Sequence, residues 1–163
     1  HHRRNSRCAG LRVGVWNKGL TVYLSTHFLL DELTHSQTAS RQGIDNTPDA
    51  QTIERLKKTC YGLEEVRILL GGYPIHISSG YRSAAINSAV GGSQGSQHLL
   101  GQAVDFTCPR FGTPKEIVRK IKDSNIQYDQ LIEEFGQWVH ISFSDRNRRH
   151  ALIIDKSGAR EFA

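Results

Sequence analysis

Apolar residues in the first half of the chain recur at the spacing of a helix. Between residues 48 and 70 they fall three or four positions apart, so they share one helical face. These positions are Ile53, Leu56, Cys60, Leu63, Val66 and Leu70. Thr47 is placed to cap the first turn, Pro48 suits the first helical position, and Gly71 is a typical stop. The pattern predicts a long amphipathic helix over residues 48–70.

A second, shorter helix is indicated by its first turn. Thr113, Pro114 and Glu116 form the signature of a capping box, in which the threonine and glutamate side chains satisfy free backbone N–H groups at the helix start. The lysine and arginine residues that follow are expected to form a solvated face of this helix.

Three segments in the second half alternate between apolar and polar residues instead. They are residues 73–79 (YPIHISS), 102–107 (QAVDFT) and 137–143 (QWVHISF). Such alternation is typical of strands with one face in the core. A hairpin turn is expected near Phe135 and Gly136, just before the third segment. These patterns predict a single α+β domain over residues 21–163, with a small antiparallel sheet and flanking helices.

Charge is concentrated at the start of the chain. The formal net charge of the 163 residues is +5. The first 20 residues contain five basic residues and no acidic one, which leaves 16 basic against 16 acidic residues in the remainder. A neutral globular part offers little to a phosphate backbone, so nucleic-acid binding is not expected.

Residues 1–20 read as a disordered lead-in or a cloning remnant. Their apolar stretch is interrupted by Arg12, Asn17 and Lys18, whereas a signal peptide needs an unbroken apolar region. No apolar run approaches the roughly 20 residues that cross a bilayer, so no membrane insertion is expected. We recognise no signal peptide and expect synthesis in the cytoplasm.

Asp105 lies between Val104 and Phe106, where a buried carboxylate needs a positive partner. His98, in a loop of small residues, and His140, in the middle of a predicted strand, complete a set of two imidazoles and one carboxylate. This set suits a divalent metal with an open position for water. Cysteine ligation is not expected, because the three cysteines are widely spaced and outside any CxxC pattern; they are Cys8, Cys60 and Cys108.

Three motifs carry a resemblance to a known family. They are SGYRS at residues 79–83, SQHLLGQAVDF at 96–106 and WVHISF at 138–143. They resemble the signatures of zinc peptidases that cut D-alanyl peptides of bacterial cell walls. That family includes D-alanyl-D-alanine carboxypeptidases and L-alanyl-D-glutamate endopeptidases used as phage endolysins, and it shares the hedgehog/DD-peptidase fold. The resemblance covers residues 21–145, and its opening is similar to the phage and prophage members.

The resemblance implies one zinc ion per chain, held by His98, Asp105 and His140. It also implies that Arg82 binds a carboxylate of a peptidoglycan stem peptide, with Ser96 of the central motif in the substrate-binding region. The fork of an arginine suits a carboxylate. The alternative for Arg82 is a structural salt bridge. A monomer is expected.

The general base is the point at which the sequence departs from the family. Many relatives have an acidic residue three positions before the last histidine, but Gln137 stands there in this chain. Strand parity across a two-residue turn pairs Glu133 with Trp138 and places Glu133 on the face of His140. The phage-type pattern DQLIxE instead matches Glu134. We favour Glu134 as the base and retain Glu133 as the alternative.

Two classes of function follow from these residues. The first is a zinc peptidase that hydrolyses peptidoglycan stem peptides and reaches the wall after lysis or delivery. An L-alanyl-D-glutamate endopeptidase is favoured over a D-alanyl-D-alanine carboxypeptidase. The alternative is a non-catalytic zinc-containing module of the same fold that binds the cell wall or a partner, as the loss of an acid at Gln137 would suggest.

Overall fold

The computed structural model describes residues 12–16 and 19–163. Strands β1 (Arg12–Trp16) and β2 (Gly19–Tyr23) pair in antiparallel fashion as a separate two-stranded sheet. Residues 12–16 and 19–20, expected in a disordered lead-in, therefore belong to paired strands. The other residues of that segment, Cys8 among them, lie outside the described residues.

The long predicted helix is present as α3 (Ala50–Leu69). Its cap differs from the prediction, because the side chain of Asp49 accepts a hydrogen bond from the backbone N–H of Thr52 at 2.7 Å. Thr47 is therefore not the cap, and Pro48 precedes the helix. The chain leaves the helix through Gly71 at a φ of 86°, a conformation that favours glycine.

Four shorter α-helices accompany it. They are α1 (Leu30–Thr34), α2 (Gln37–Gln42), α4 (Ala84–Ala89) and α5 (Pro114–Lys122). The predicted capping box is confirmed at the start of α5, where the side chains of Thr113 and Glu116 make both reciprocal bonds. Within the part of the chain that the structure describes, no helix is long and apolar enough to cross a membrane.

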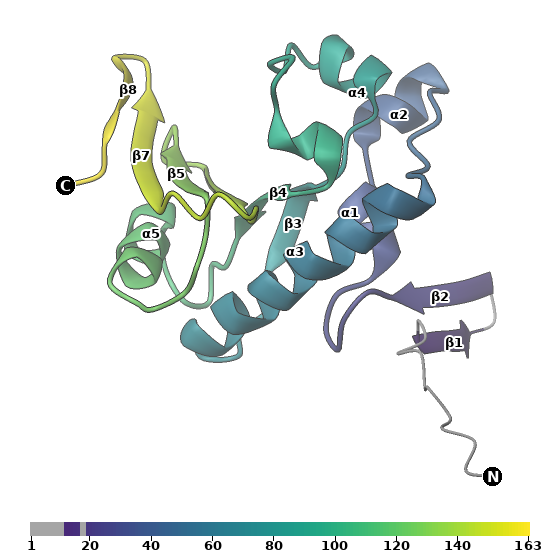
Figure 1. Ribbon diagram of the computed structural model, residues 1–163, viewed down its shortest axis with the longest axis horizontal. Coiled ribbons are helices and arrows are strands. Elements are labelled where there is room, and N and C mark those ends of the chain that lie inside the picture. Colours follow the sequence, from purple (N-terminus) through teal and green to yellow (C-terminus); the bar gives the residue numbers. More distant parts are fainter. Residues whose placement is uncertain (1–11, 17–18) are drawn as a thin grey trace, which may run out of the picture.

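The main sheet has six strands in the order β3-β4-β6-β5-β7-β8. They are β3 (His76–Ser79), β4 (Ala103–Thr107), β5 (Gln130–Glu134), β6 (Trp138–Ser142), β7 (His150–Asp155) and β8 (Gly158–Glu161). The sheet is not wholly antiparallel as predicted, because β5 and β7 run parallel. The C-terminal strands β7 and β8 were not among the predicted segments. The α+β class is confirmed (Figure 1).

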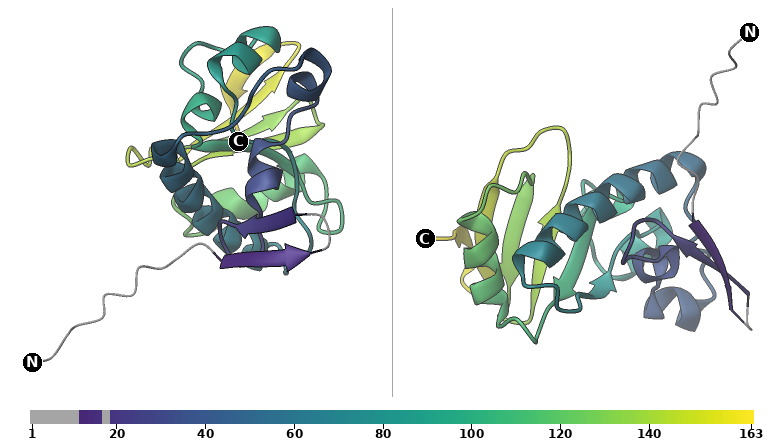
Figure 2. Two further views of the ribbon diagram at one scale, coloured as in Figure 1. Left: turned by 90° about the vertical axis from the view of Figure 1, so that its right-hand side faces the viewer. Right: turned by 90° about the horizontal axis from the view of Figure 1, so that it is seen from below.

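The hydrophobic core lies between the sheet and two helices. Buried side chains of α3 and α5 pack with Val104 and Phe106 of β4 and with Val139 and Ile141 of β6. Figure 2 shows α3 running across the strands and α5 beside them. Successive strand residues point to opposite faces. Asp105 therefore faces away from this core.

Candidate metal centre

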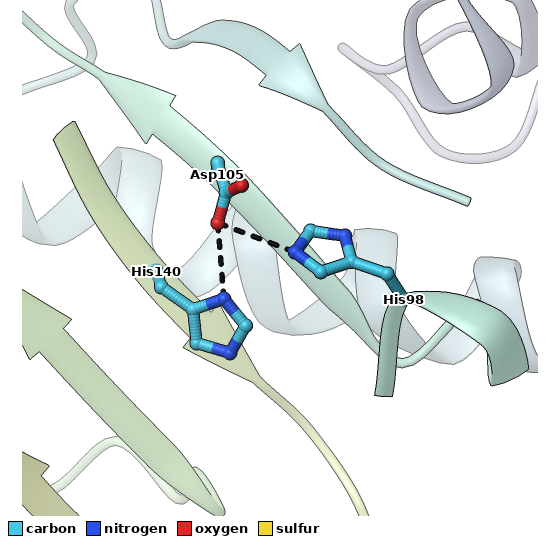
Figure 3. A group of neighbouring side chains, drawn as sticks. All are labelled: His98, Asp105 and His140. Atoms are coloured by element: carbon cyan, nitrogen blue, oxygen red, sulfur yellow. Dashed lines mark hydrogen bonds and ion pairs between the residues drawn. The ribbon is translucent and has the colours of Figure 1, made fainter. Parts of the chain in front are cut away.

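Three side chains meet on the face of the sheet opposite the core (Figure 3). Asp105 on β4 and His140 on β6 are direct partners in the strand register. His98 comes from the short 3₁₀-helix η1 (Gln97–Leu100), just before β4. The Oδ1 atom of Asp105 lies 3.0 Å from Nδ1 of His140 and 3.3 Å from Nε2 of His98. One ligand atom from each of the three residues lies within 4.8 Å of the others.

The orientation of His98 is fixed by its second ring nitrogen. Nδ1 lies 2.7 Å from the carbonyl oxygen of Gly80. Because a carbonyl can only accept, Nδ1 carries the proton and Nε2 presents a lone pair toward Asp105. This pairing of an imidazole with a backbone carbonyl is the usual support for a metal-binding histidine.

Local sequence makes this approach possible. Gly80 lies against the backbone of Leu33, and a Cβ atom at Gly80 would collide with the Leu33 carbonyl. Ser96 caps η1 by accepting from the N–H of His98 at 3.2 Å. Gly101 ends η1 with a φ of 71°, which turns the chain into β4. Small residues thus bring His98 over the strand that carries Asp105.

The electrostatics of the three residues suit a cation. Asp105 is 7% exposed and His98 is 3% exposed. Burial alone would raise the pKa of Asp105, but the neighbouring imidazoles of His140 and His98 outweigh burial and hold it well below its ordinary value. A charged carboxylate and two imidazole nitrogens directed at one point are a donor set that fits Zn²⁺.

Arg82 lies beside the same carboxylate. Its Nη2 atom is 3.5 Å from Oδ2 of Asp105. The rest of its guanidinium is held by Ser79, which accepts from Nε at 3.2 Å, and by Asn87, which accepts from Nη1 at 3.2 Å. The salt bridge considered as the alternative for Arg82 is therefore present. Arg82 also lines the same cavity as the three candidate ligands.

The two glutamates lie on opposite faces of β5. Glu134 pairs with Trp138 in the register, and its Oε1 atom is 3.9 Å from Nδ1 of His140. Glu133 pairs with Val139, whose side chain faces the core side of the sheet. The parity argument for Glu133 assumed a two-residue turn, and that assumption is wrong.

Three residues separate β5 from β6, which shifts the pairing by one position. They are Phe135, Gly136 and Gln137, and Phe135 has a φ of 55°. Gln137 is exposed in this loop and is not among the residues that line the cavity. The hairpin turn expected near Phe135 and Gly136 is confirmed.

These residues border one cavity of about 510 Å³. Its lining joins the three candidate ligands and Glu134 with Arg82 and Ser96. The lining residues that the sequence interpretation did not assign to the site include Trp138, Arg146 and Arg148. Trp138 stands in the motif WVHISF, and the signal for the two arginines was the cluster in DRNRR at residues 145–149.

Asp129 was also missed. It is fully buried and binds Arg148 through two contacts, Nε to Oδ1 at 2.7 Å and Nη2 to Oδ2 at 2.9 Å. Oδ2 of Asp129 also accepts from Nε2 of Gln97 at 2.8 Å. Asp129 therefore ties the loop before β7 to the segment that carries His98.

Comparison with known proteins agrees with this geometry. The sequence profile of the family described as Peptidase M15 matches residues 26–142, which is most of the chain. The chain therefore belongs to the peptidase M15 family. It is also similar to the zinc D-Ala-D-Ala carboxypeptidase of Streptomyces albus G, at 40% identity over 48 residues. That stretch is 29% of this chain and 19% of the Streptomyces protein.

Proposed function

We propose that the protein is a zinc-dependent peptidase that hydrolyses peptidoglycan stem peptides. The observation that carries this proposal is the convergence of His98, Asp105 and His140 in one cavity with an acid, Glu134, and a cation, Arg82. Membership of a peptidase family and the similarity to a zinc D-Ala-D-Ala carboxypeptidase support it.

Zinc would be held by Nε2 of His98, a carboxylate oxygen of Asp105 and Nδ1 of His140. When bound, it supplies a Lewis acid that polarises a peptide carbonyl and acidifies water. Gly80 fixes the tautomer of His98 for this role.

Glu134 is proposed as the general base. Burial raises its pKa, and the charge of Asp105 raises it further, against lowering by His140 and Arg82. Its position beside His140 allows it to accept a proton from the attacking water and pass that proton to the leaving amine. The same position would make a base at Gln137 unnecessary.

Arg82 is proposed to bind a substrate carboxylate next to the scissile bond. Ser79 and Asn87 hold Nε and Nη1, so the guanidinium is fixed before a substrate arrives. A fixed guanidinium loses little freedom on binding, and this favours both affinity and orientation. Ser96, in the same lining, is proposed to contact the peptide there.

Within this class we propose an L-alanyl-D-glutamate endopeptidase rather than a D-alanyl-D-alanine carboxypeptidase. Both substrates present a carboxylate close to the scissile bond, so Arg82 serves either. Support for the endopeptidase is the similarity of residues 24–48 to the opening of phage and prophage members. A lytic enzyme must cut the wall open, whereas trimming a terminal alanine leaves crosslinks in place.

Digestion of purified sacculi tests whether the protein cleaves peptidoglycan and which bond it cleaves. Each digest is run with and without a chelator, and mass spectrometry identifies the new termini. We expect new N-terminal D-glutamate only without the chelator. Release of free D-alanine without new D-glutamate termini would select the carboxypeptidase. Absence of any cleavage by zinc-loaded protein would favour the non-catalytic binding module.

A further inference from the structure

A second cationic group lies at the side of the cavity away from Arg82. Arg82 follows β3, at one edge of the sheet, whereas Arg146 and Arg148 precede β7. Strands β4, β6 and β5 lie between β3 and β7 in the sheet, and they carry Asp105, His140 and Glu134. The cavity at the candidate metal centre therefore has arginine on both sides.

The loop that carries these arginines is held in place from two directions. Asp129 fixes Arg148, as described above, and leaves its Nη1 atom without a protein acceptor among the described residues. Arg149 donates to the carbonyls of Lys122, Ser124 and Ile126, at the end of α5 and in the segment after it. Arg148 and Arg149 both follow Arg146, so these bonds fix the C-terminal end of the loop that carries it.

Arg146 lies two residues before Arg148, and its backbone N–H donates to Oγ of Ser144 at 3.3 Å. Within the described part of the chain it makes no salt bridge, although it lines the cavity and is exposed. The other two arginines of the lining each have an acidic partner, Asp105 for Arg82 and Asp129 for Arg148. Arg146 therefore contributes an uncompensated positive charge.

We propose that Arg146, assisted by the free side of Arg148, binds a second carboxylate of the substrate. This carboxylate would be a different one from the carboxylate held by Arg82. The inference rests on the proposed function and narrows it to stem peptides that carry two free carboxylates. Two neighbouring guanidinium groups offer the paired donors that a carboxylate accepts. Peptides in which the second carboxylate is amidated would be poorer ligands.

Binding of matched peptides tests this subsite. The probes are a synthetic stem peptide with free carboxylates on D-glutamate and on diaminopimelate, and two forms in which one or the other is amidated. Calorimetry measures their affinity for the wild-type protein and for Arg146→Gln. Arg110→Gln is the matched control, because Arg110 is exposed, stacks on Tyr73 and does not line the cavity.

We expect Arg146→Gln to weaken binding of the free-acid peptide by about tenfold, the scale of one charged hydrogen bond. Amidation of the carboxylate that Arg146 binds should weaken binding to the wild-type protein by a similar factor. The two losses should not add, because they remove the same contact. Arg146→Lys should recover part of the affinity, and Arg110→Gln should bind all three peptides as the wild-type protein does.

If the loss from Arg146→Gln and the loss from amidation add for both amidated peptides, the proposed subsite is wrong, whether or not the peptides are cleaved. Non-additive losses without cleavage would uphold the subsite and reject the peptidase.

Discussion

The buried carboxylate of Asp129 is expected to stabilise the fold through its charge. The substitution Asp129→Asn keeps the size of the side chain but removes that charge and replaces an acceptor oxygen with a donor NH₂ group. The new NH₂ group would face Arg148 in either orientation, because Arg148 donates to both oxygens of Asp129, and at the Oδ2 position it would also face Gln97. Two hydrogen bonds are therefore lost, and donors are left facing each other.

The size of the expected loss of stability depends on how exposed the Arg148 side chain is. Breaking a fully buried ion pair costs about 3–5 kcal/mol. The Arg148 side chain is 34% exposed and can regain water, so the loss approaches that of charged hydrogen bonds, about 2–3 kcal/mol. For a domain of this size that lowers Tm by roughly 4–12 °C.

Asp155→Asn is the matched control. Asp155 also binds an arginine through two contacts, with Nη1 and Nη2 of Arg160 at 3.0 and 2.8 Å from its oxygens. The Arg160 side chain is 53% exposed, and a solvent-screened pair of this kind contributes little to stability. Urea unfolding followed by circular dichroism measures both variants. Equal and small losses for Asp129→Asn and Asp155→Asn would refute the reasoning.

The contribution of Asp129 to the free energy of unfolding should decrease in acid. The hydrogen bonds from Arg148 lower the pKa of Asp129 in the folded protein. Its stabilising effect is therefore fully present above the unfolded pKa of about 4, and it is lost as pH falls through the folded value. The difference in unfolding free energy between wild type and Asp129→Asn should be constant at neutral pH and shrink below about pH 4. A difference that grows in acid would contradict this assignment.

Two further predictions concern the metal centre. Glu134→Gln should retain zinc and lose about 10²-fold or more in peptide turnover, whereas Glu133→Gln should lose much less; reversed losses in steady-state kinetics would show that the base is Glu133. Gly80→Ala should weaken zinc affinity by about 10- to 100-fold, because the new Cβ would push Gly80 off the backbone of Leu33 and disturb its bond to His98. Competition with a chromogenic chelator measures this affinity, and an unchanged value would mean that the Gly80 carbonyl does not support His98.

The candidate metal-binding set could be predicted because it depends on local pattern. Asp105 and His140 alternate with apolar neighbours, so strand periodicity places both on the polar face. The glycines and serines around His98 indicate a loop that can bend toward that face. Adjacent pairing of the two strands then brings the residues together.

The position of the base depended on a turn that local pattern does not fix. Phe135 adopts a positive φ, which is rare for an aromatic residue, and the connection has three residues rather than two. One extra residue reverses which glutamate shares a face with His140. The choice of Glu134 came from family resemblance, and the strand geometry supports it for a reason that the parity argument missed.

Polar contacts between residues far apart in the sequence could not be predicted. Asp129 and Arg148 are 19 positions apart, and no periodicity links them. The parallel pairing of β5 with β7 brings their loops together, but a parallel neighbour cannot be inferred from a six-residue run such as HALIID. The cap of α3 was predicted at Thr47 rather than Asp49. Both are good capping residues, so residue type alone does not decide between them.

Zinc titration of activity tests the central claim most directly. The protein is stripped of metal with a chelator, zinc is returned in fractions of an equivalent, and cleavage of purified peptidoglycan is measured at each step. We predict no cleavage without metal, and activity that rises linearly and saturates at one zinc per chain. His98→Ala should remain inactive at that stoichiometry. Cleavage by the stripped protein, or no cleavage at any zinc level, would contradict the account.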